Sequence, residues 1–253
     1  MSTSQAPPIS VALDVPDAGR ARELYRALRP YTDHFKIGPH LLLGSGPGFV
    51  RELADDGAKV FLDLKFHDIP QTVYSSALQA CRLRPFMFDV HALTGDEAIR
   101  RAVRATRDSG IAPRPNVLAV TVLVSHGPEY FDAYLGGQRP TEDVVTRYAA
   151  RARQAGVDGI VCSPDEAAAV RAAHGPDFLI VTPGVRFREE QADDHAPHRI
   201  ATFGDPRLKN SSVLVAGRPI IAAPDPVEAL RTAQRLLDEA VTGGADGAAA
   251  TQR

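Results

Sequence analysis

Residues 61–70 read Phe-Leu-Asp-Leu-Lys-Phe-His-Asp-Ile-Pro, an apolar run that ends in charged residues. Asp63 and Lys65 occupy alternate positions of this run, so in a β-strand both side chains point to one side, about 6–7 Å apart. Asp68 follows just past the expected strand end, and Pro70 closes the loop before a helical segment. Charges on a buried strand face are costly unless they pair or hold a ligand. The stretch therefore predicts a strand with a charge network at its carboxyl end.

Seven other apolar runs accompany this one, and segments of helical period lie between them. The strand candidates are residues 9–15, 34–38, 59–65, 86–92, 116–123, 159–163, 178–184 and 213–217. The helical candidates are residues 17–28, 48–55, 72–82, 96–108, 142–154, 164–172 and 226–240. Nearly continuous apolar strands that alternate with helices indicate parallel strands buried on both faces. Eight such strands favour a closed (β/α)8 barrel, the TIM barrel of the α/β class, over an open doubly wound sheet.

The chain length of 253 residues is the usual size of one such barrel. With a hydrophobic fraction of 44%, a single core needs no disulfide or metal for its stability. We expect one barrel domain over residues 9–240, a disordered N-terminal tail at 1–8 and a disordered C-terminal tail at 241–253. Residues 203–211 contain glycine, proline and asparagine, so we expect a short or irregular helix there.

Charge and cysteine content narrow the choice of partners and compartment. A formal net charge of −2 gives no reason to expect non-specific nucleic-acid binding. No apolar run approaches the length of a membrane span, and the first residues lack the apolar centre of a signal peptide. Cys81 and Cys162 have no metal-ligand spacing and fall in a helical and a strand segment. These features predict a cytoplasmic protein with reduced, buried cysteines and with neither nucleic-acid nor membrane partners.

Ionisable residues collect at the ends of the first three predicted strands. Asp14 ends the first strand and Lys36 lies in the second. Together with Asp63, Lys65 and Asp68 they lie at the carboxyl mouths of three successive strands, where barrel enzymes build their active sites. The alternative is a structural ion-pair network at the same end of the barrel. The shared location of all five residues favours a catalytic site.

Residues 61–70 resemble the signature of bacterial orotidine 5'-phosphate decarboxylases. Further elements similar to that family follow in family order, at residues 12–14, 35–38, 90–92, 120–123, 161–163, 181–186 and 217–219. The Asp-x-Lys-x-x-Asp core alone is shared with related sugar-phosphate enzymes, whereas the full set is specific. The resemblance implies a cofactor-independent carboxy-lyase that converts orotidine 5'-phosphate to UMP, the last step of de novo pyrimidine nucleotide biosynthesis, without a metal.

The resemblance also implies roles for individual residues. Lys36, Asp63, Lys65 and Asp68 would form an alternating charge network beneath C6 of the pyrimidine, and Lys65 would stabilise and protonate the C6 carbanion. The family is homodimeric, so Asp68 and Thr72 would contribute to the neighbouring subunit's site. The substrate-binding residues would be Asp14, Lys36, Asp63 and Thr72 around the ribose and carboxylate, and Arg186, Gly217 and Arg218 around the 5'-phosphate.

Three positions depart from the family pattern. Gln71 replaces the usual Asn, Val124 replaces a Thr that contacts the pyrimidine edge, and His195 replaces a Gln that spans base and phosphate. We expect Ser125 and His195 to supply the base contacts. The departures leave other hypotheses open: a specialised paralogue that decarboxylates or binds a modified pyrimidine nucleotide, a non-catalytic nucleotide sensor, or a magnesium-dependent sugar-phosphate enzyme. The intact charge network argues against a sensor. The sequence shows no additional carboxylate placed to bind a metal, which argues against the magnesium-dependent enzyme.

Overall fold

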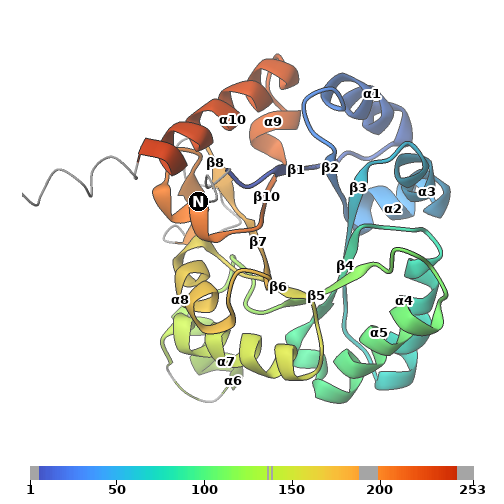
Figure 1. Ribbon diagram of the computed structural model, residues 1–253, viewed down its shortest axis with the longest axis vertical. Coiled ribbons are helices and arrows are strands. Elements are labelled where there is room, and N and C mark those ends of the chain that lie inside the picture. Colours follow the sequence, from blue (N-terminus) through green and yellow to red (C-terminus); the bar gives the residue numbers. More distant parts are fainter. Residues whose placement is uncertain (1–5, 136, 138, 188–198, 244–253) are drawn as a thin grey trace, which may run out of the picture.

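The computed structural model describes residues 6–135, 137, 139–187 and 199–243, and their parallel strands close into a barrel in the order β1-β10-β7-β6-β5-β4-β3-β2 (Figure 1). The barrel strands are β1 (Ile9–Ala12), β2 (His34–Ile37), β3 (Lys59–Phe66), β4 (Met87–His91), β5 (Asn116–Val120), β6 (Gly159–Val161), β7 (Leu179–Pro183) and β10 (Val213–Ala216). The predicted (β/α)8 barrel is confirmed. Because the strands follow one another around the barrel, β1, β2 and β3 are direct neighbours.

Helices surround the barrel on its outside (Figure 1). They are α1 (Ala18–Leu28), α2 (Pro39–Ser45), α3 (Pro47–Asp55), α4 (Pro70–Cys81), α5 (Asp96–Asp108), α6 (Pro128–Leu135), α7 (Thr141–Gln154), α8 (Pro164–His174), α9 (Arg218–Ile221) and α10 (Pro226–Gly243). A short parallel pair, β8 (Val185–Arg186) and β9 (Ala201–Thr202), follows β7. The weak segment at 203–211 contains only the 3-10 helix η3 (Pro206–Asn210), as expected, and a second one, η1 (Ala92–Thr94), follows β4.

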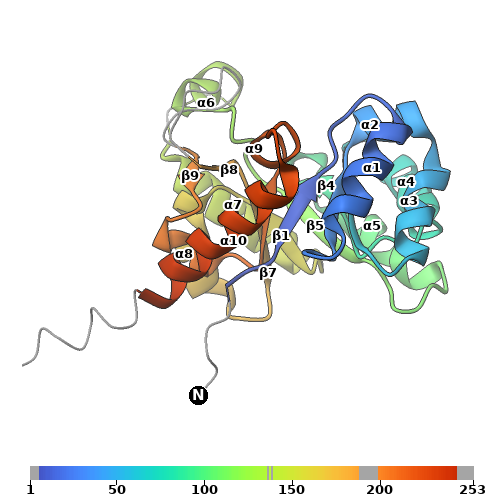
Figure 2. The same cartoon turned by 90° about the horizontal axis from the view of Figure 1, so that it is seen from above.

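Apolar side chains fill the inside of the barrel as well as the space between strands and helices. The inner cluster consists of buried residues from seven strands: Ala12, Phe61, Met87, Leu118, Val120, Val161, Val181, Val213 and Val215. A filled interior leaves no channel, so a ligand can bind only at an end of the barrel. Seen from the side, α6, α9 and the β8–β9 pair gather at one end of the molecule (Figure 2).

Helix starts close to this end are determined by local sequence. Pro70 takes the first position of α4, where its missing N–H breaks no hydrogen bond. Ser163 and Glu166 form a capping box at the start of α8, in which the Glu166 side chain accepts from the Ser163 backbone N–H at 3.0 Å. Both helices therefore begin immediately after a strand and a short loop, which positions the loops around the barrel mouth.

The predicted tails at 1–8 and 241–253 lie largely outside the described residues, although α10 continues to Gly243, past the expected boundary at residue 240. Cys81 and Cys162 are free thiols in buried positions. None of the described helices combines the length and the apolar character that crossing a membrane requires.

Substitution of Gly159 tests how tightly β6 packs against β7. A Cβ atom at this position of β6 would overlap the carbonyl oxygen and Cβ of Leu179 on β7. We expect Gly159→Ala to lower the free energy of unfolding by about 1–3 kcal/mol, because backbone atoms have to move. Urea denaturation measures the change. The control is Gly48→Ala in α3, where an added Cβ meets nothing within 4 Å. This substitution should stabilise the protein by about 0.4–1 kcal/mol. Equal stability of both variants would contradict this packing.

Candidate active site

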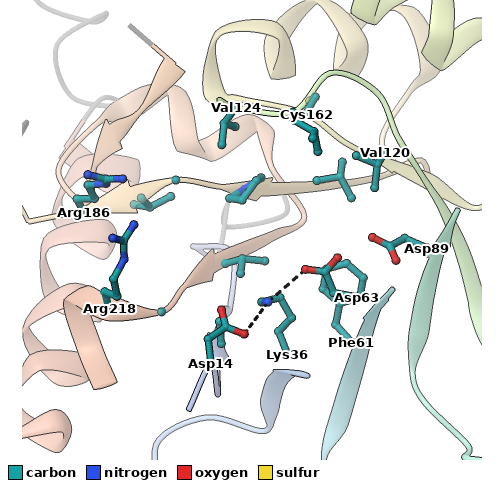
Figure 3. Close-up of a pocket in the computed structure, with 18 of the residues that line it drawn as sticks. Asp14, Lys36, Phe61, Asp63, Asp89, Val120, Val124, Cys162, Arg186 and Arg218 are labelled. Carbon is teal, nitrogen blue, oxygen red and sulfur yellow. Dashed lines mark hydrogen bonds and ion pairs between the residues drawn. The ribbon is translucent and has the colours of Figure 1, made fainter. Parts of the chain in front are cut away.

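A cavity of about 940 Å³ opens at the carboxyl ends of the strands. Charged residues of β2, β3 and β4 and of the β1 end line one part of it, and Arg186 and Arg218 line another (Figure 3). Apolar side chains such as Val120 and Val161 also line the cavity. The cavity therefore offers a small ligand both a charge network and a separate cationic region.

The charged part is a continuous chain of ion pairs. Lys36 Nζ lies 3.1 Å from Asp14 Oδ1 and 3.2 Å from Asp63 Oδ2. Lys65 Nζ pairs with the other Asp63 oxygen, Oδ1. The side chains of Lys36 and Asp63 are only 11% and 12% exposed, whereas that of Lys65 is 37% exposed. Four residues predicted at the ends of three neighbouring strands thus meet in the order carboxylate, ammonium, carboxylate, ammonium.

Mutual attraction keeps the buried members of this chain ionised. Burial by itself would raise the pKa of Asp63, but the ammonium groups of Lys36 and Lys65 outweigh it and hold this pKa below its usual value. Burial would likewise lower the pKa of Lys36, and the carboxylates of Asp63 and Asp14 raise it instead. At neutral pH the site therefore presents a fixed carboxylate between two cationic side chains.

The backbone at Lys65 departs from a regular strand. Lys65 has a φ of 48°, and the pairing of β3 with β4 shifts register between Leu62 and Phe66. A non-glycine residue in this left-handed region costs about 1–3 kcal/mol, so surrounding contacts have to hold it. Asp89 Oδ1 provides them by accepting the backbone N–H groups of Leu64 at 2.8 Å and Lys65 at 2.7 Å. Simple alternation predicted the shared side of Asp63 and Lys65 but not this irregularity.

The cationic region is formed by residues that follow the last two barrel strands, β7 and β10. Arg186 lies in β8, and Arg218 is the first residue of α9 (Figure 3). Gly217 precedes it, and a Cβ there would lie 3.3 Å from the Cβ of Ala12, so a larger residue would press on β1. Guanidinium groups bind phosphate oxygens through paired N–H donors. This region therefore suits an anionic group on the same ligand that reaches the charge network.

Other predicted site residues do not reach the cavity of their own chain. Asp68, Thr72 and Ser125 are exposed and are absent from the cavity lining, although Val124 lines it. Asp68 is fixed on the surface by Thr94, whose hydroxyl donates to the Asp68 carbonyl at 2.9 Å and accepts from its N–H at 3.1 Å. The remaining predicted residue, His195, lies outside the described residues.

Arg199 is a buried charge that sequence reasoning missed. Its side chain is 1% exposed and pairs with Glu166, itself 3% exposed, at 3.1 Å. The guanidinium also donates to the carbonyls of Leu123 and His126, each at 3.1 Å. Arg199 thus ties the loop after β5, including the cavity residues Leu123 and Val124, to the start of α8. Nothing in the sequence near Arg199 distinguishes it from the many surface arginines.

Residues 7–233 match the orotidine 5'-phosphate decarboxylase / HUMPS family. The chain belongs to this family.

Several members of the decarboxylase family are close relatives of this chain. It is 44% identical over 226 residues to the orotidine 5'-phosphate decarboxylase of Moorella thermoacetica, which covers 88% of this chain and 89% of that protein. The enzyme of the same name from Syntrophotalea carbinolica is 45% identical over 231 residues, 90% of this chain and 92% of that protein. The crystal structure of orotidine 5'-phosphate decarboxylase from Lactobacillus acidophilus superposes with a TM-score of 0.75 at 32% identity, over 92% of this chain and 100% of that one.

Replacing Arg199 tests its role in this decarboxylase-family barrel. We expect Arg199→Met to lower the free energy of unfolding by about 3–5 kcal/mol, because Glu166 is left as an unpaired buried charge. Adding Glu166→Gln should recover part of that loss. As a control, Arg207→Met removes an exposed guanidinium that pairs with Asp165 and Asp205, and should cost at most about 1 kcal/mol. Denaturant unfolding measures all three, and equal costs for Arg199→Met and Arg207→Met would contradict the buried pairing.

Proposed function

We propose that this chain decarboxylates orotidine 5'-phosphate to UMP and CO2 without a cofactor or metal, as a carboxy-lyase of pyrimidine nucleotide biosynthesis. The observation that carries the proposal is the chain Asp14–Lys36–Asp63–Lys65 in one cavity with Arg186 and Arg218. Family membership and the names of the relatives support the same reaction.

Substrate binding follows from the two regions of the cavity. The 5'-phosphate binds Arg186 and Arg218, beside the backbone of Gly217. The ribose hydroxyls then lie near Asp14 and Lys36, which offer an acceptor and a donor. The pyrimidine ring packs against apolar side chains of the lining such as Val120, and its C6 carboxylate points toward Asp63 and Lys65. Binding energy from the remote phosphate orients the reacting carbon and contributes to lowering the barrier.

The chemical step breaks the bond between C6 and the carboxylate carbon. Carbon dioxide leaves without the bonding electron pair, which stays on C6 as a localised carbanion. The Lys65 ammonium stabilises this charge and then transfers a proton to C6, and solvent reprotonates Lys65. Opposite charges about 4 Å apart at an effective dielectric near 20 attract by about 4 kcal/mol, or about three decades in rate. Because Asp63 already orients the Lys65 ammonium, little reorganisation is needed at the moment of reaction.

A homodimer is part of the proposal, because Asp68 and Thr72 do not reach their own cavity. Asp68 precedes Ile69, whose side chain is 66% exposed, and it is hydrogen-bonded to Thr94, which follows Leu93, 37% exposed. Apolar side chains that together form an exposed patch favour an interface with another protein molecule. A second copy placed on this surface would receive Asp68 and Thr72 in its own site.

Val124 favours a second candidate function. It lines the cavity but carries no hydrogen-bonding group for the pyrimidine edge, and the neighbouring Ser125 is exposed outside the lining. Such an apolar lining would suit a base-modified pyrimidine nucleotide, the substrate of a specialised paralogue. Rates on orotidine 5'-phosphate and on base-modified analogues decide between the two, and a faster reaction of the unmodified nucleotide rejects the second candidate.

We also propose a cytoplasmic location. Its support is the pair of free, buried cysteines, Cys81 and Cys162, which suits a reducing compartment.

Replacing the proposed proton donor tests the reaction. We expect Lys65→Ala to lower kcat by about three decades or more, since it removes the charge that stabilises the carbanion. Loss of the orotate absorbance and chromatographic detection of UMP measure turnover, and titration with UMP shows that binding persists. Lys209→Ala in η3 is the control, because Lys209 is exposed and lies outside the cavity, so it should match the unmodified protein. Folded, unmodified protein that forms no UMP would reject the proposed function.

Subunit complementation tests the shared site. Lys65→Ala and Asp68→Ala homodimers should each be nearly inactive. Refolding them together at equal amounts should restore about a quarter of the activity, since half of the dimers are mixed and each holds one intact site. Co-refolding Lys65→Ala with Lys36→Ala is the control, because both residues belong to the same chain's cavity and no intact site can form. Equal recovery in both mixtures, or none in either, would contradict the contribution of Asp68 to a neighbouring site.

A further inference from the structure

Asp89 is a buried acid in the cavity that the reaction described above does not use. It lies near the middle of β4, is 0% exposed, and is part of the cavity lining. Its Oδ1 accepts the backbone N–H groups of Leu64 and Lys65. Its second oxygen, Oδ2, is buried and has no hydrogen-bond donor among the described residues. An acceptor left without a donor in a buried position is costly, so its protonation state needs an explanation.

Besides these backbone groups, Asp89 interacts with a second carboxyl, that of Asp63. Asp63 lies within hydrogen-bonding reach of Asp89, and both side chains face the same part of the cavity (Figure 3). Two ionised carboxylates only accept hydrogen bonds, so such a bond requires a proton on one of them. Lys36 and Lys65 hold Asp63 in its ionised form through two ion pairs. The proton therefore belongs to Asp89.

The surroundings of Asp89 agree with this assignment. Burial raises its pKa well above the usual value, and the negative charge of Asp63 raises it further. The one cation that acts in the opposite direction is Lys65, on β3. On the other side, β5 presents Leu118 opposite Asp89, and Asn116–Val120 contains no ionisable side chain. On β4 itself the ionisable neighbour is His91, two positions along the strand.

We propose that Asp89 is a positioning residue for the decarboxylation: as a neutral acid it donates a hydrogen bond from Oδ2 to the Asp63 carboxylate, while Oδ1 holds the backbone of Leu64 and Lys65. The inference rests on the proposed function. Asp63 then has an oriented partner on three sides, Lys36, Lys65 and Asp89. Lys65 keeps its left-handed backbone because Asp89 accepts its N–H, so one side chain positions both the ammonium and the carboxylate.

Two substitutions separate this role from general packing. Asp89→Asn keeps an acceptor for the two backbone N–H groups and supplies an amide donor toward Asp63. Its kcat should stay within about tenfold of the unmodified protein, because it reproduces the hydrogen bonds of the neutral acid. Asp89→Leu fills similar space but removes donor and acceptor, so kcat should fall about 100-fold or more. Since the phosphate region is untouched, UMP affinity should change far less than kcat.

Thr121→Val is the matched control. Thr121 lies just after β5, is 1% exposed, and donates at 2.8 Å to the Val161 carbonyl, but it does not line the cavity. This variant loses a buried hydrogen bond and should keep its kcat. A positioning role requires rescue by Asn and loss by Leu. Equal losses in Asp89→Asn and Asp89→Leu, or a normal kcat in Asp89→Leu, would overturn it.

An infrared measurement tests the protonation state without relying on activity. Protein labelled with carboxyl-13C aspartate should show the carbonyl stretch of a protonated carboxylic acid at neutral pH, and Asp89→Asn should lose this band. Absence of the band would overturn the proposal even in an active enzyme. Conversely, a protein that shows the band but does not decarboxylate orotidine 5'-phosphate would reject the proposed function and leave the neutral acid at Asp89 established.

Discussion

The Asp63 carboxylate between the ammonium groups of Lys36 and Lys65 is the interaction on which the site depends. A buried ion is stable only with well-placed counter-ions, and breaking such a pair costs several kcal/mol. Consecutive barrel strands meet this requirement directly, since β1, β2 and β3 are neighbours and each delivers one or two members of the chain. In the proposed reaction, the same arrangement leaves the Lys65 cation next to the position where the carbanion forms.

The rest of the barrel restricts where a ligand can lie. Apolar side chains fill the interior below the charge network, so the cavity opens only toward the strand ends. Arg186 and Arg218 lie in its other part, where we propose that they bind the 5'-phosphate of the nucleotide. Arg199 supports the part of the cavity lined by Leu123 and Val124, because it links the loop after β5 to α8. Binding at one part and chemistry at the other are thereby held in one rigid geometry.

Irregular backbone and unusual protonation coincide at one place, the turn of β3 at Lys65. The left-handed conformation of Lys65 is unfavourable by itself, and Asp89 compensates for it through two hydrogen bonds. Because Asp89 also adjoins Asp63, the backbone conformation of Lys65, the proposed proton donor, and the orientation of its counter-ion are linked. Strain of this kind is typical of residues whose direction matters for chemistry.

The barrel could be predicted from the sequence alone, because the alternation of apolar strands with amphipathic helices is a local pattern that does not depend on distant contacts. The sequence also predicted that Asp14, Lys36, Asp63 and Lys65 lie at neighbouring strand ends, since parallel strands bring their carboxyl ends to one side. The contacts of Asp89 and Arg199, and the position of Ser125 outside the cavity, could be recognised only in the folded barrel. Asp89 and Arg199 act on residues more than twenty positions away, and local periodicity carries no information about such contacts.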